Sequence, residues 1–509
     1  MSDNSASNKR IAKNTILLYV RMFITLIVGL YTSRVILDSL GVEDFGIYNV
    51  VGGFVAMFSV LRAGLVSATQ RFITFDLGNN DTKELKSTFS TCVIIYIALA
   101  VLVVILAESF GSWFVNNKLA IPAERIGAAQ IVFQFSVIAF VVSFISFPYN
   151  ALIIAHEKME AFAYISIYEV FSKLAISYII YITTYDKLIV YAGLIAIVQI
   201  TIPLLYYLYC KYKFKETTVV WKIRWAKVRS IYSFTGWAMF GGFANIGFTQ
   251  GLNVLLGMFF APSVNAARGI AVQIQGVVTQ FVGNFQLAID PQIIKSYAKG
   301  DVDYLRKLMF TSSKYSYFLL LFMSLPIMIE ADYLLSLWLV EVPECTTLFM
   351  RLILLTTMYD AVSNPFGKAI QATGNIKRYQ IIVSGLLILI LPVSSIFLKL
   401  GFDAYSVFVV HVVIGFIAAL VRIEMSCALV NIKMIDVVRG IFIPSVLVTL
   451  FAASLPLLYH IVTEDSLSNM IICFFISCLM MCVSVWLLGM TKAERQTVKS
   501  KIKQKIYNL

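Results

Sequence analysis

Arginine side chains lie inside or at the mouths of several long apolar runs in this chain. They are Arg21, Arg34, Arg62 and Arg268. A charge at the centre of a membrane costs about 2.5–3.5 kcal/mol on insertion scales, so its presence there indicates a function. A guanidinium group matches two phosphate oxygens in bidentate geometry. The excess of interior positive charge therefore predicts a binding site for an anionic ligand.

Two of these arginines also have a structural interpretation. Arg21 lies about six residues, or roughly 9 Å, from the expected cytoplasmic end of its run, and Arg62 lies closer to its own end. Basic side chains at these depths can extend to the lipid headgroups. Arg21 shares a helical face with Thr25, Gly29 and Thr32, and this polar stripe favours a cavity. Both interpretations stay open.

Three further interior charges are candidates for coupling or gating. Glu169 and Lys173 are spaced i,i+4, in the order that favours an ion pair within one helix. The pair could neutralise itself or serve as a gate deep in the membrane. Asp360 is the third candidate, and Lys314 and Arg351 are other interior charges.

Uncharged polar residues form stripes on two consecutive apolar runs. The stripes are Gly242, Asn245, Thr249 and Asn253, and then Gln273, Gly276, Gln280 and Asn284. Amides and small residues at this spacing can hold helices together. Two such stripes in succession favour a wet cavity that binds hydroxyl-rich ligands.

The elements that must carry these residues are membrane-spanning helices. Hydrophobic residues make up 59% of the chain and charged residues 14%, against roughly 45–50% and 25% in soluble domains. Apolar runs of about 20 residues predict fourteen spans, hence an all-α polytopic membrane protein. The spans are residues 15–37, 45–67, 88–107, 126–147, 160–183, 188–209, 231–260, 269–289, 308–329, 346–366, 379–398, 404–429, 440–460 and 470–490.

The chain also repeats itself. The segment QRFITFDLGNNDTKELK at 70–86 corresponds to DPQIIKSYAKGDVDYLR at 290–306, an offset of 220. Pro148 and Ala155 correspond to Pro365 and Ala372 at an offset of 217. These matches predict two six-helix repeats followed by two C-terminal helices, an arrangement found in transporters.

The basic residues predict the topology and the domain limits. Most of the 41 Lys and Arg residues fall on the side of the N-terminus, which places both termini in the cytoplasm. The net charge of +13 is then explained by topology and by contact with anionic lipids, not by nucleic-acid binding. The predicted parts are an N-terminal bundle (1–209), a basic cytoplasmic linker (210–230), a second bundle (231–430), two added helices (431–490) and a basic cytoplasmic tail (491–509).

Motifs for catalysis or for a cofactor are not found in the sequence. It has no phosphate-binding glycine loop, no dinucleotide fingerprint and no convincing nucleophile constellation. The seven cysteines form no CxxC pair, and the three scattered histidines argue against a histidine-based metal site. We therefore expect neither an enzyme nor a metalloprotein. His411, inside the twelfth span, is a candidate proton relay or a packing residue.

One segment carries a family resemblance. The run TSRVILDSLGVEDFGIYNV at 32–50 resembles the corner between the first two spans of bacterial polysaccharide exporters. Their pattern of an arginine, a leucine-glycine pair, an acidic residue and an aromatic-glycine pair is filled by Arg34, Leu40, Gly41, Glu43, Phe45 and Gly46. The chain thus resembles the multidrug/oligosaccharidyl-lipid/polysaccharide (MOP) exporter superfamily, and within it the Wzx-type flippases of O-antigen or capsule repeat units.

This resemblance implies a specific activity. Such proteins move an undecaprenyl-pyrophosphate-linked oligosaccharide from the cytoplasmic to the periplasmic leaflet, by alternating access through a cationic central cavity. Arg34 matches the family arginine, and Arg21 and Arg268 would face the pyrophosphate by analogy of placement. The loops after Gln70 and Asp290 would gate the cavity from the cytoplasm. The resemblance also implies the bacterial inner membrane. We expect a monomer because both halves already lie in one chain, with other polysaccharide-assembly proteins as candidate partners at the basic linker or tail.

Other functions stay open as alternatives. A lipid II flippase or another exporter of the superfamily is one, although the first spans have fewer arginines than lipid II flippases carry. A cation antiporter would need acids in the first or seventh span. A membrane polysaccharide polymerase, an enzyme, would carry a large periplasmic loop, and no external loop here is long enough. The energy source is undecided between a proton or sodium gradient and the membrane potential, and no cofactor is expected.

Overall fold

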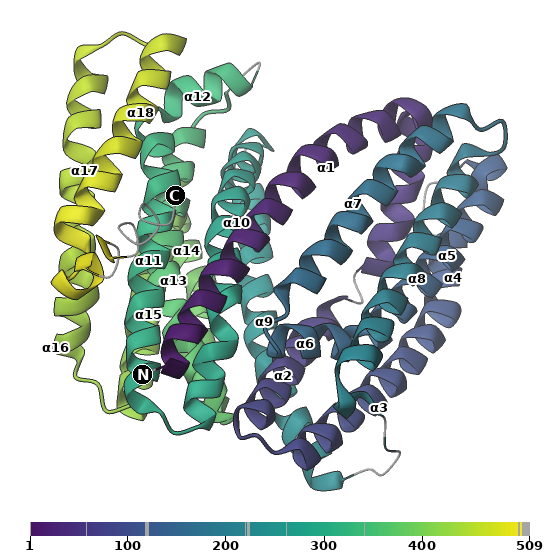
Figure 1. Cartoon of the computed structure of the whole chain (residues 1–509). Helices are drawn as coiled ribbons and strands as arrows, with labels where there is room; N and C mark the ends of the chain where they lie inside the picture. Colours follow the sequence, from purple (N-terminus) through teal and green to yellow (C-terminus); the bar gives the residue numbers. More distant parts are fainter. Residues whose placement is uncertain are drawn as a thin grey trace. The chain divides into compact units, whose positions relative to one another are not determined.

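The computed structural model describes residues 2–56, 59–117, 122–218, 220, 224–260, 262–339, 342–496 and 499–500. Some side chains within these ranges also lie outside the description, among them those of Arg34 and Arg62. Every regular element in the described ranges is a helix (Figure 1). The predicted all-α class is confirmed.

The described residues of the first half form eight α-helices. They are α1 (Ser2–Ala56), α2 (Ser59–Gly78), α3 (Thr82–Leu106), α4 (Ser112–Asn117), α5 (Ile126–Ile145), α6 (Phe147–Ala155), α7 (Met159–Ile182) and α8 (Lys187–Lys213). Helix α1 contains the first predicted span and most of the second. Its backbone turns sharply at Gly41, where φ is 77° and ψ is 166°, a conformation that glycine adopts readily because it has no Cβ.

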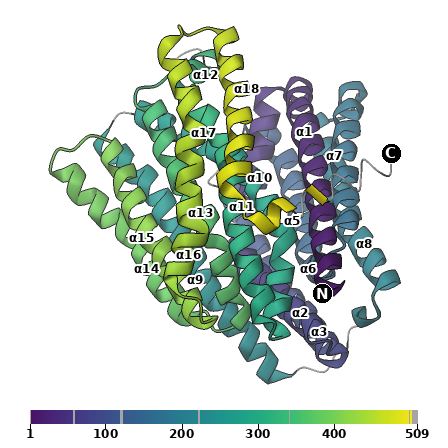
Figure 2. The same ribbon diagram turned by 60° about the vertical axis from the view of Figure 1, so that its left-hand side comes forward.

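In the second half, the part of the chain that the structure describes contains ten α-helices. They are α9 (Trp225–Phe259), α10 (Pro262–Ala298), α11 (Val302–Ile329), α12 (Ala331–Trp338), α13 (Thr346–Thr373), α14 (Lys377–Lys399), α15 (Tyr405–Leu429), α16 (Met434–Val437), α17 (Ile443–Val462) and α18 (Leu467–Ser484). Helices α17 and α18, the two predicted additions, form a hairpin that packs on α11 (Figure 2).

Ten helical segments in the described part of the chain are long and apolar enough to cross a membrane. They account for ten of the fourteen predicted spans. The described residues of the other four (45–67, 231–260, 269–289 and 346–366) also lie almost entirely in helices, which are not among those ten segments. The seventh and eighth spans carry the polar stripes, so their low hydropathy has a visible cause.

The backbone confirms the repeat at its two turns. Asn80, between α2 and α3, has φ 58°, and Gly300, 220 positions later between α10 and α11, has φ 69°. Three backbone hydrogen bonds close each turn at equivalent positions. In the first turn the N–H groups of Asn79, Asn80 and Asp81 donate to the carbonyl oxygens of Phe75, Leu77 and Asp76, respectively. In the second turn the N–H groups of Lys299, Gly300 and Asp301 donate to those of Lys295, Tyr297 and Ser296, respectively.

A second pair of equivalent positions lies where the fifth helix of each repeat begins. Glu157, between α6 and α7, has φ 59°, and Gly374, 217 positions later between α13 and α14, has φ 81°. We call residues 155–159 the first corner and residues 372–376 the second corner. The matched segments that contain Pro148 and Pro365 are therefore each followed by a reversal of chain direction.

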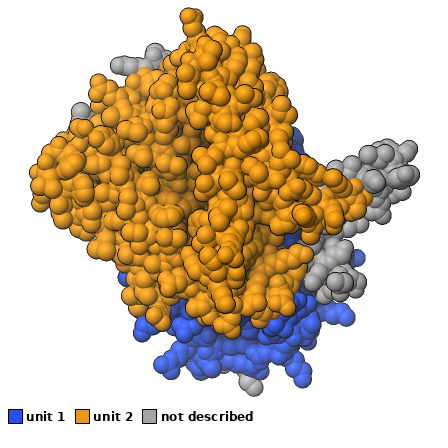
Figure 3. All heavy atoms as spheres, turned by 90° about the vertical axis from the view of Figure 1, so that its left-hand side faces the viewer, with its two compact units in different colours: residues 1–242, 294–301, 372–377 blue, residues 243–293, 302–371, 378–509 orange. Residues whose placement is uncertain are grey.

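The chain divides into two compact units, coloured separately in Figure 3. The first contains residues 1–242, 294–301 and 372–377, and the second contains residues 243–293, 302–371 and 378–509. The first unit thus includes two short segments from the second half of the sequence, namely the turn after α10 and the second corner. The five domain limits predicted from the sequence stay a prediction.

Candidate functional site

The second corner is held by an arginine from the end of α2. Nε and Nη2 of Arg71 donate to the carbonyl oxygen of Ala372 at 3.2 and 2.7 Å. The guanidinium lies 4.5 Å from the ring centres of Phe72 and Phe75, and Arg71 is only 6% exposed. A Cβ on Gly374 would lie 2.8 Å from Nη2 of the arginine. The absence of a side chain there leaves room for the guanidinium.

The first corner is held by a lysine from the end of α10. Lys295 Nζ forms an ion pair with the carboxylate of Glu157, whose side chain is 1% exposed. Arg10 lies 3.7 Å from the same carboxylate, and Asn14 Nδ2 donates to the Glu157 carbonyl oxygen at 3.1 Å. A carboxylate buried this deeply needs a paired charge, and Lys295 supplies it.

These two contacts are reciprocal. The end of α2 binds the second corner, and the end of α10, its repeat equivalent, binds the first corner. Gly78 and Ala298 are also equivalent, and a Cβ on Gly78 would lie 3.0 Å from that of Ala298. Equivalent residues that touch each other lie close to a local pseudo-two-fold axis. We call the Arg71–Ala372 and Lys295–Glu157 contacts the interlock; both lie within the first unit.

Three predicted site residues come together where α1 packs on α7. Arg21 Nη1 donates to Ser166 Oγ at 3.4 Å, and its guanidinium lies 4.6 Å from the Phe162 ring centre. Glu169 is close enough to interact electrostatically with Arg21. Lys173 Nζ pairs with Glu169 Oε1 at 2.6 Å. One carboxylate therefore lies among two cations, and the cluster keeps a net positive charge.

The remaining predicted cations are Arg34, Arg62 and Arg268. The side chains of Arg34 and Arg62 lie outside the described part of the structure. Arg268 is 8% exposed, donates through Nη2 to the Thr249 carbonyl oxygen at 2.8 Å, and binds the Asn253 side chain through Nη1. Both contacts join α10 to α9. In this conformation Arg268 holds two helices together.

The predicted glutamines of α10 lie on a different face of the helix from the residues that line a cavity in the second unit. Gln273 and Gln280 are exposed, whereas Gln275, Thr279 and Gln286 line the cavity. Helix α10 carries amides on more than one face. Helical periodicity groups residues that share a face, but it does not identify the neighbour that the face meets.

One cavity of the second unit is lined by apolar and polar residues and contains a charged pair. Its volume is about 320 Å³, and the lining residues include Asn245, Asp360, Asn364, His411 and Arg422. Arg422 Nη1 donates to Ser363 Oγ at 3.0 Å and to Asn364 Oδ1 at 2.9 Å. It lies 3.8 Å from Asp360 Oδ1. Asp360, predicted as a coupling residue, thus faces an arginine.

A second cavity of about 270 Å³ has Gln286, Asn364 and Arg422 in common with the first. Its walls include Asp290 and Lys368, which form an ion pair at 2.9 Å. Arg422 therefore borders two carboxylate sites. A polar region of this kind can exchange a proton or bind a small cation at one carboxylate and transmit the change through the arginine.

The sequence prediction missed several of these residues for identifiable reasons. Arg422 lies inside the predicted span 404–429, and its charge alone was a sufficient signal. Asp290 and Lys368 lie just outside the predicted spans 269–289 and 346–366, because α10 and α13 continue to Ala298 and Thr373. Arg71 lies beyond the predicted end of the second span, so hydropathy gave no reason to select it.

Two other interior charges have structural partners. Lys314 Nζ pairs with Glu494 Oε2 at 2.8 Å, and Glu494 also accepts from the backbone N–H of Thr491 at 2.7 Å. Arg351 pairs with Asp332 at 3.3 Å and donates to the Met328 carbonyl oxygen. Lys314 and Arg351 therefore fasten helix ends.

Comparison with known proteins identifies the sequence family and the fold. Residues 11–291 match the family model described as polysaccharide biosynthesis protein. No curated protein matches the chain by sequence. A crystal structure of a MATE mutant superposes with a TM-score of 0.71 at 13% identity, covering 84% of this chain and 96% of that chain.

Two further solved structures show the same likeness. An outward-facing multidrug resistance MATE family transporter of the MOP superfamily gives a TM-score of 0.68 at 14% identity. A MOP superfamily transporter from Pyrococcus furiosus gives 0.67 at 15% identity. Each covers 84% of this chain and 96% of its own chain. The fold is that of MATE-type transporters.

Proposed function

Because the chain belongs to the polysaccharide biosynthesis protein family and has a MATE-type fold, we propose that it is a glycan-lipid flippase. It moves an undecaprenyl-pyrophosphate-linked oligosaccharide from the cytoplasmic to the periplasmic leaflet of the bacterial inner membrane, as a monomer. The chain is a multi-spanning membrane protein, and the related solved structures are of transporters. Transport is therefore better supported than catalysis.

The observation that carries the mechanism is the interlock. A transporter built from two repeats changes access when one repeat moves against the other. The interlock joins the two halves of the sequence at four equivalent chain segments, including the turns after α2 and α10. These turns lie in the loops after Gln70 and Asp290, which the sequence predicted as cytoplasmic gates. We infer that the interlock is the closed cytoplasmic gate, with both termini on the same side.

The cluster of Arg21, Glu169 and Lys173 is the proposed pyrophosphate site. Both cations have Glu169 nearby in the structure. An entering pyrophosphate would compete with this carboxylate for the cations, and a doubly charged group makes stronger charge-assisted hydrogen bonds than one carboxylate. Arg34 and Arg62 stay candidates for the same ligand. Arg268 would first have to leave Thr249 and Asn253.

Asp360 is the proposed coupling residue. Its carboxylate faces Arg422, so protonation or binding of a sodium ion would weaken that attraction and change the packing of α13 on α15. The exposed stripe residues Asn245, Gln273 and Gln280 stay candidates for contacts with the glycan. Anionic lipids and other assembly proteins are proposed to bind the basic linker and tail.

A leaflet assay tests the proposal. In cells that lack the protein, a glycosidase added to the periplasm should fail to reach the lipid-linked units, and wild-type protein should restore access. Arg21→Ala should fail to restore it at unchanged protein level, whereas Arg21→Lys should restore part. Units that reach the periplasm without the protein and stay unpolymerised would point to a polymerase or assembly role instead.

The gate is tested separately. Gly78→Cys and Ala298→Cys place two thiols close together, and a shift of about half an ångström brings their Cβ atoms into the range for a disulfide. Oxidation should trap the gate closed and stop export, and reduction should restore it. Each single variant is the control for crowding at these positions. Full export by the oxidised, cross-linked protein would contradict a gate here.

A further inference from the structure

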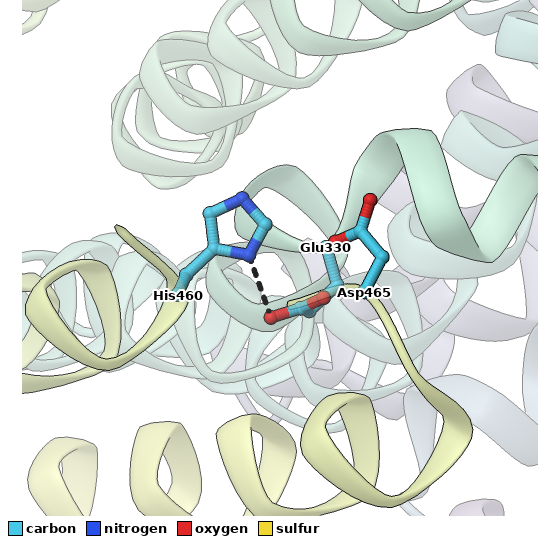
Figure 4. A group of neighbouring side chains, drawn as sticks. All are labelled: Glu330, His460 and Asp465. Atoms are coloured by element: carbon cyan, nitrogen blue, oxygen red, sulfur yellow. Dashed lines mark hydrogen bonds and ion pairs between the residues drawn. The ribbon is translucent and has the colours of Figure 1, made fainter. Parts of the chain in front are cut away.

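Three metal-ligating side chains converge at one end of the second unit, as Figure 4 shows. Glu330 directly follows α11, His460 lies in the last turn of α17, and Asp465 lies in the turn between α17 and α18. One ligand atom from each lies within 4.8 Å of the others, and His460 Nδ1 is 3.1 Å from Glu330 Oε1. None of the three belongs to the proposed transport site.

The charge of this cluster is not balanced by its own members. The Glu330 side chain is 5% exposed and that of His460 is 33% exposed. Two carboxylates outnumber the single imidazole, so the cluster keeps a net negative charge when both carboxylates are ionised. The nearby Cys473 thiol is within hydrogen-bonding reach of Glu330 but adds no positive charge. A divalent cation would neutralise the cluster.

The position of Glu330 is fixed by its backbone. Its N–H donates to the Pro326 carbonyl oxygen at 3.0 Å, and its own carbonyl oxygen accepts from Leu334 N–H at 2.8 Å. The carboxylate is therefore presented from a rigid junction of α11 and α12. Asp465 is exposed, which leaves a path from solvent to the cluster.

We propose that Glu330, His460 and Asp465 bind one divalent transition-metal ion, with zinc or manganese as the expected classes. An imidazole nitrogen with two carboxylate oxygens suits these ions, whereas calcium and magnesium prefer oxygen ligands alone. Bonds of about 2.1 Å to a tetrahedral ion place the ligand atoms roughly 3.4 Å apart. His460 Nδ1 and Glu330 Oε1 are already 3.1 Å apart, so binding requires chiefly an approach of the Asp465 carboxylate.

The ion would fasten the C-terminal hairpin to the repeat. Helix α11 already holds the chain after α18 through Lys314 and Glu494, near the middle of α11. The metal site lies at the C-terminal end of α11, where it meets the α17–α18 turn. The hairpin would then be attached at both ends. The sequence predicted no histidine-based metal site, because the ligands come from positions 330 and 460–465 and include a single histidine.

The test uses the purified full-length protein in detergent, stripped with a chelator and then titrated with zinc alone. We expect one equivalent of bound zinc by elemental analysis and a rise in melting temperature that saturates at that ratio. Asp465→Asn, at an exposed position, should lower zinc affinity at least tenfold, whereas Glu464→Gln next to it should not. Cobalt in place of zinc should give visible d–d absorption that Asp465→Asn weakens.

The opposite result is equally clear. The site would be overturned if wild type and Asp465→Asn bound zinc or cobalt equally. It would also be overturned if the wild type bound neither zinc nor manganese in the same titration. In that case Glu330 and His460 form an ion pair only. None of these readouts depends on transport, so the result does not rest on the proposed function.

Discussion

The two corners of the repeat have the same backbone and different chemistry. Glu157 and Gly374 occupy equivalent positions with φ of 59° and 81°. At the first corner the bound group is a side-chain carboxylate, which Lys295 and Arg10 neutralise. At the second corner it is a main-chain carbonyl, that of Ala372, which Arg71 binds through two N–H groups.

This difference shows how a duplicated element can diverge while it keeps its place. The repeat preserves the chain reversal and the helix end that meets it. The side chains on each side have changed together, so that each corner has a partner suited to it. The first corner should be sensitive to the loss of a charge, and the second to the loss of a fork-shaped donor or of the space beside it.

The largest effect is expected from Glu157→Gln. The substitution leaves the Lys295 ammonium, whose side chain is 16% exposed, without its carboxylate. Breaking one member of a buried ion pair costs about 3–5 kcal/mol. We expect the yield of the Gly78→Cys, Ala298→Cys cross-link to fall sharply. Glu160→Gln is the matched control, because Glu160 pairs with Lys13 at the surface. Equal cross-linking of the two variants would mean that the Glu157–Lys295 ion pair does not hold the two helix ends together.

Arg71→Ala should have the next largest effect. It leaves the buried carbonyl of Ala372 without its donors, which costs about 1–3 kcal/mol, and removes the packing on Phe72 and Phe75. Arg71→Lys keeps the charge but not the planar fork, so it should rescue only part of the cross-linking. If Arg71→Lys behaves as wild type, charge alone holds the second corner and the contrast between the corners disappears.

The sequence predicted the helices and the repeat because both depend on local patterns. Apolar runs mark the spans, and Pro148 and Pro365 mark the corners. The interlock depends on contacts across long distances in the chain, such as the 301 positions between Arg71 and Ala372, and no local pattern encodes them.

The candidate site was predictable to a smaller extent. The Glu169–Lys173 pair follows from its i,i+4 spacing, and its ion pair is present. The neighbours of Arg21 on α7 lie about 145 positions away and could not be read from spacing. Arg422 was predictable as an interior charge, but its position between Asp360 and the second cavity depends on how α13 and α15 pack.

Gly374→Ala should have an intermediate effect. A left-handed conformation costs a residue with a Cβ about 1–2 kcal/mol, and the new Cβ would also lie 2.8 Å from the Arg71 guanidinium. Gly300→Ala is the matched control, because Gly300 has φ 69° and no heavy atom within 4 Å of its Cβ position. The difference in cross-linking between the two variants measures the crowding alone. Identical results would mean that Arg71 moves aside freely.

The smallest effect is expected from Glu216→Gln, beside the first corner. His156 Nε2 lies 2.6 Å from Glu216 Oε1, and its ring stacks on Phe214 at 4.0 Å. The hydrogen bond with His156 lowers the pKa of Glu216 below its usual value. A depressed carboxyl pKa contributes stability above the unfolded value, about 4.3, and that stability is lost as the pH falls through the folded pKa.

The melting temperature of the wild type should therefore fall more between about pH 5 and pH 3 than that of Glu216→Gln, because the linked stability is lost below the unfolded pKa of about 4.3. The second corner is bound through a carbonyl and an arginine, neither of which titrates in this range. Arg71→Ala should consequently keep the full acid sensitivity of the wild type, at a lower melting temperature throughout. If Glu216→Gln and wild type lose stability in parallel, the His156 contact adds nothing to the first corner. The charge contrast between the corners would then rest on Glu157 and its partners Lys295 and Arg10.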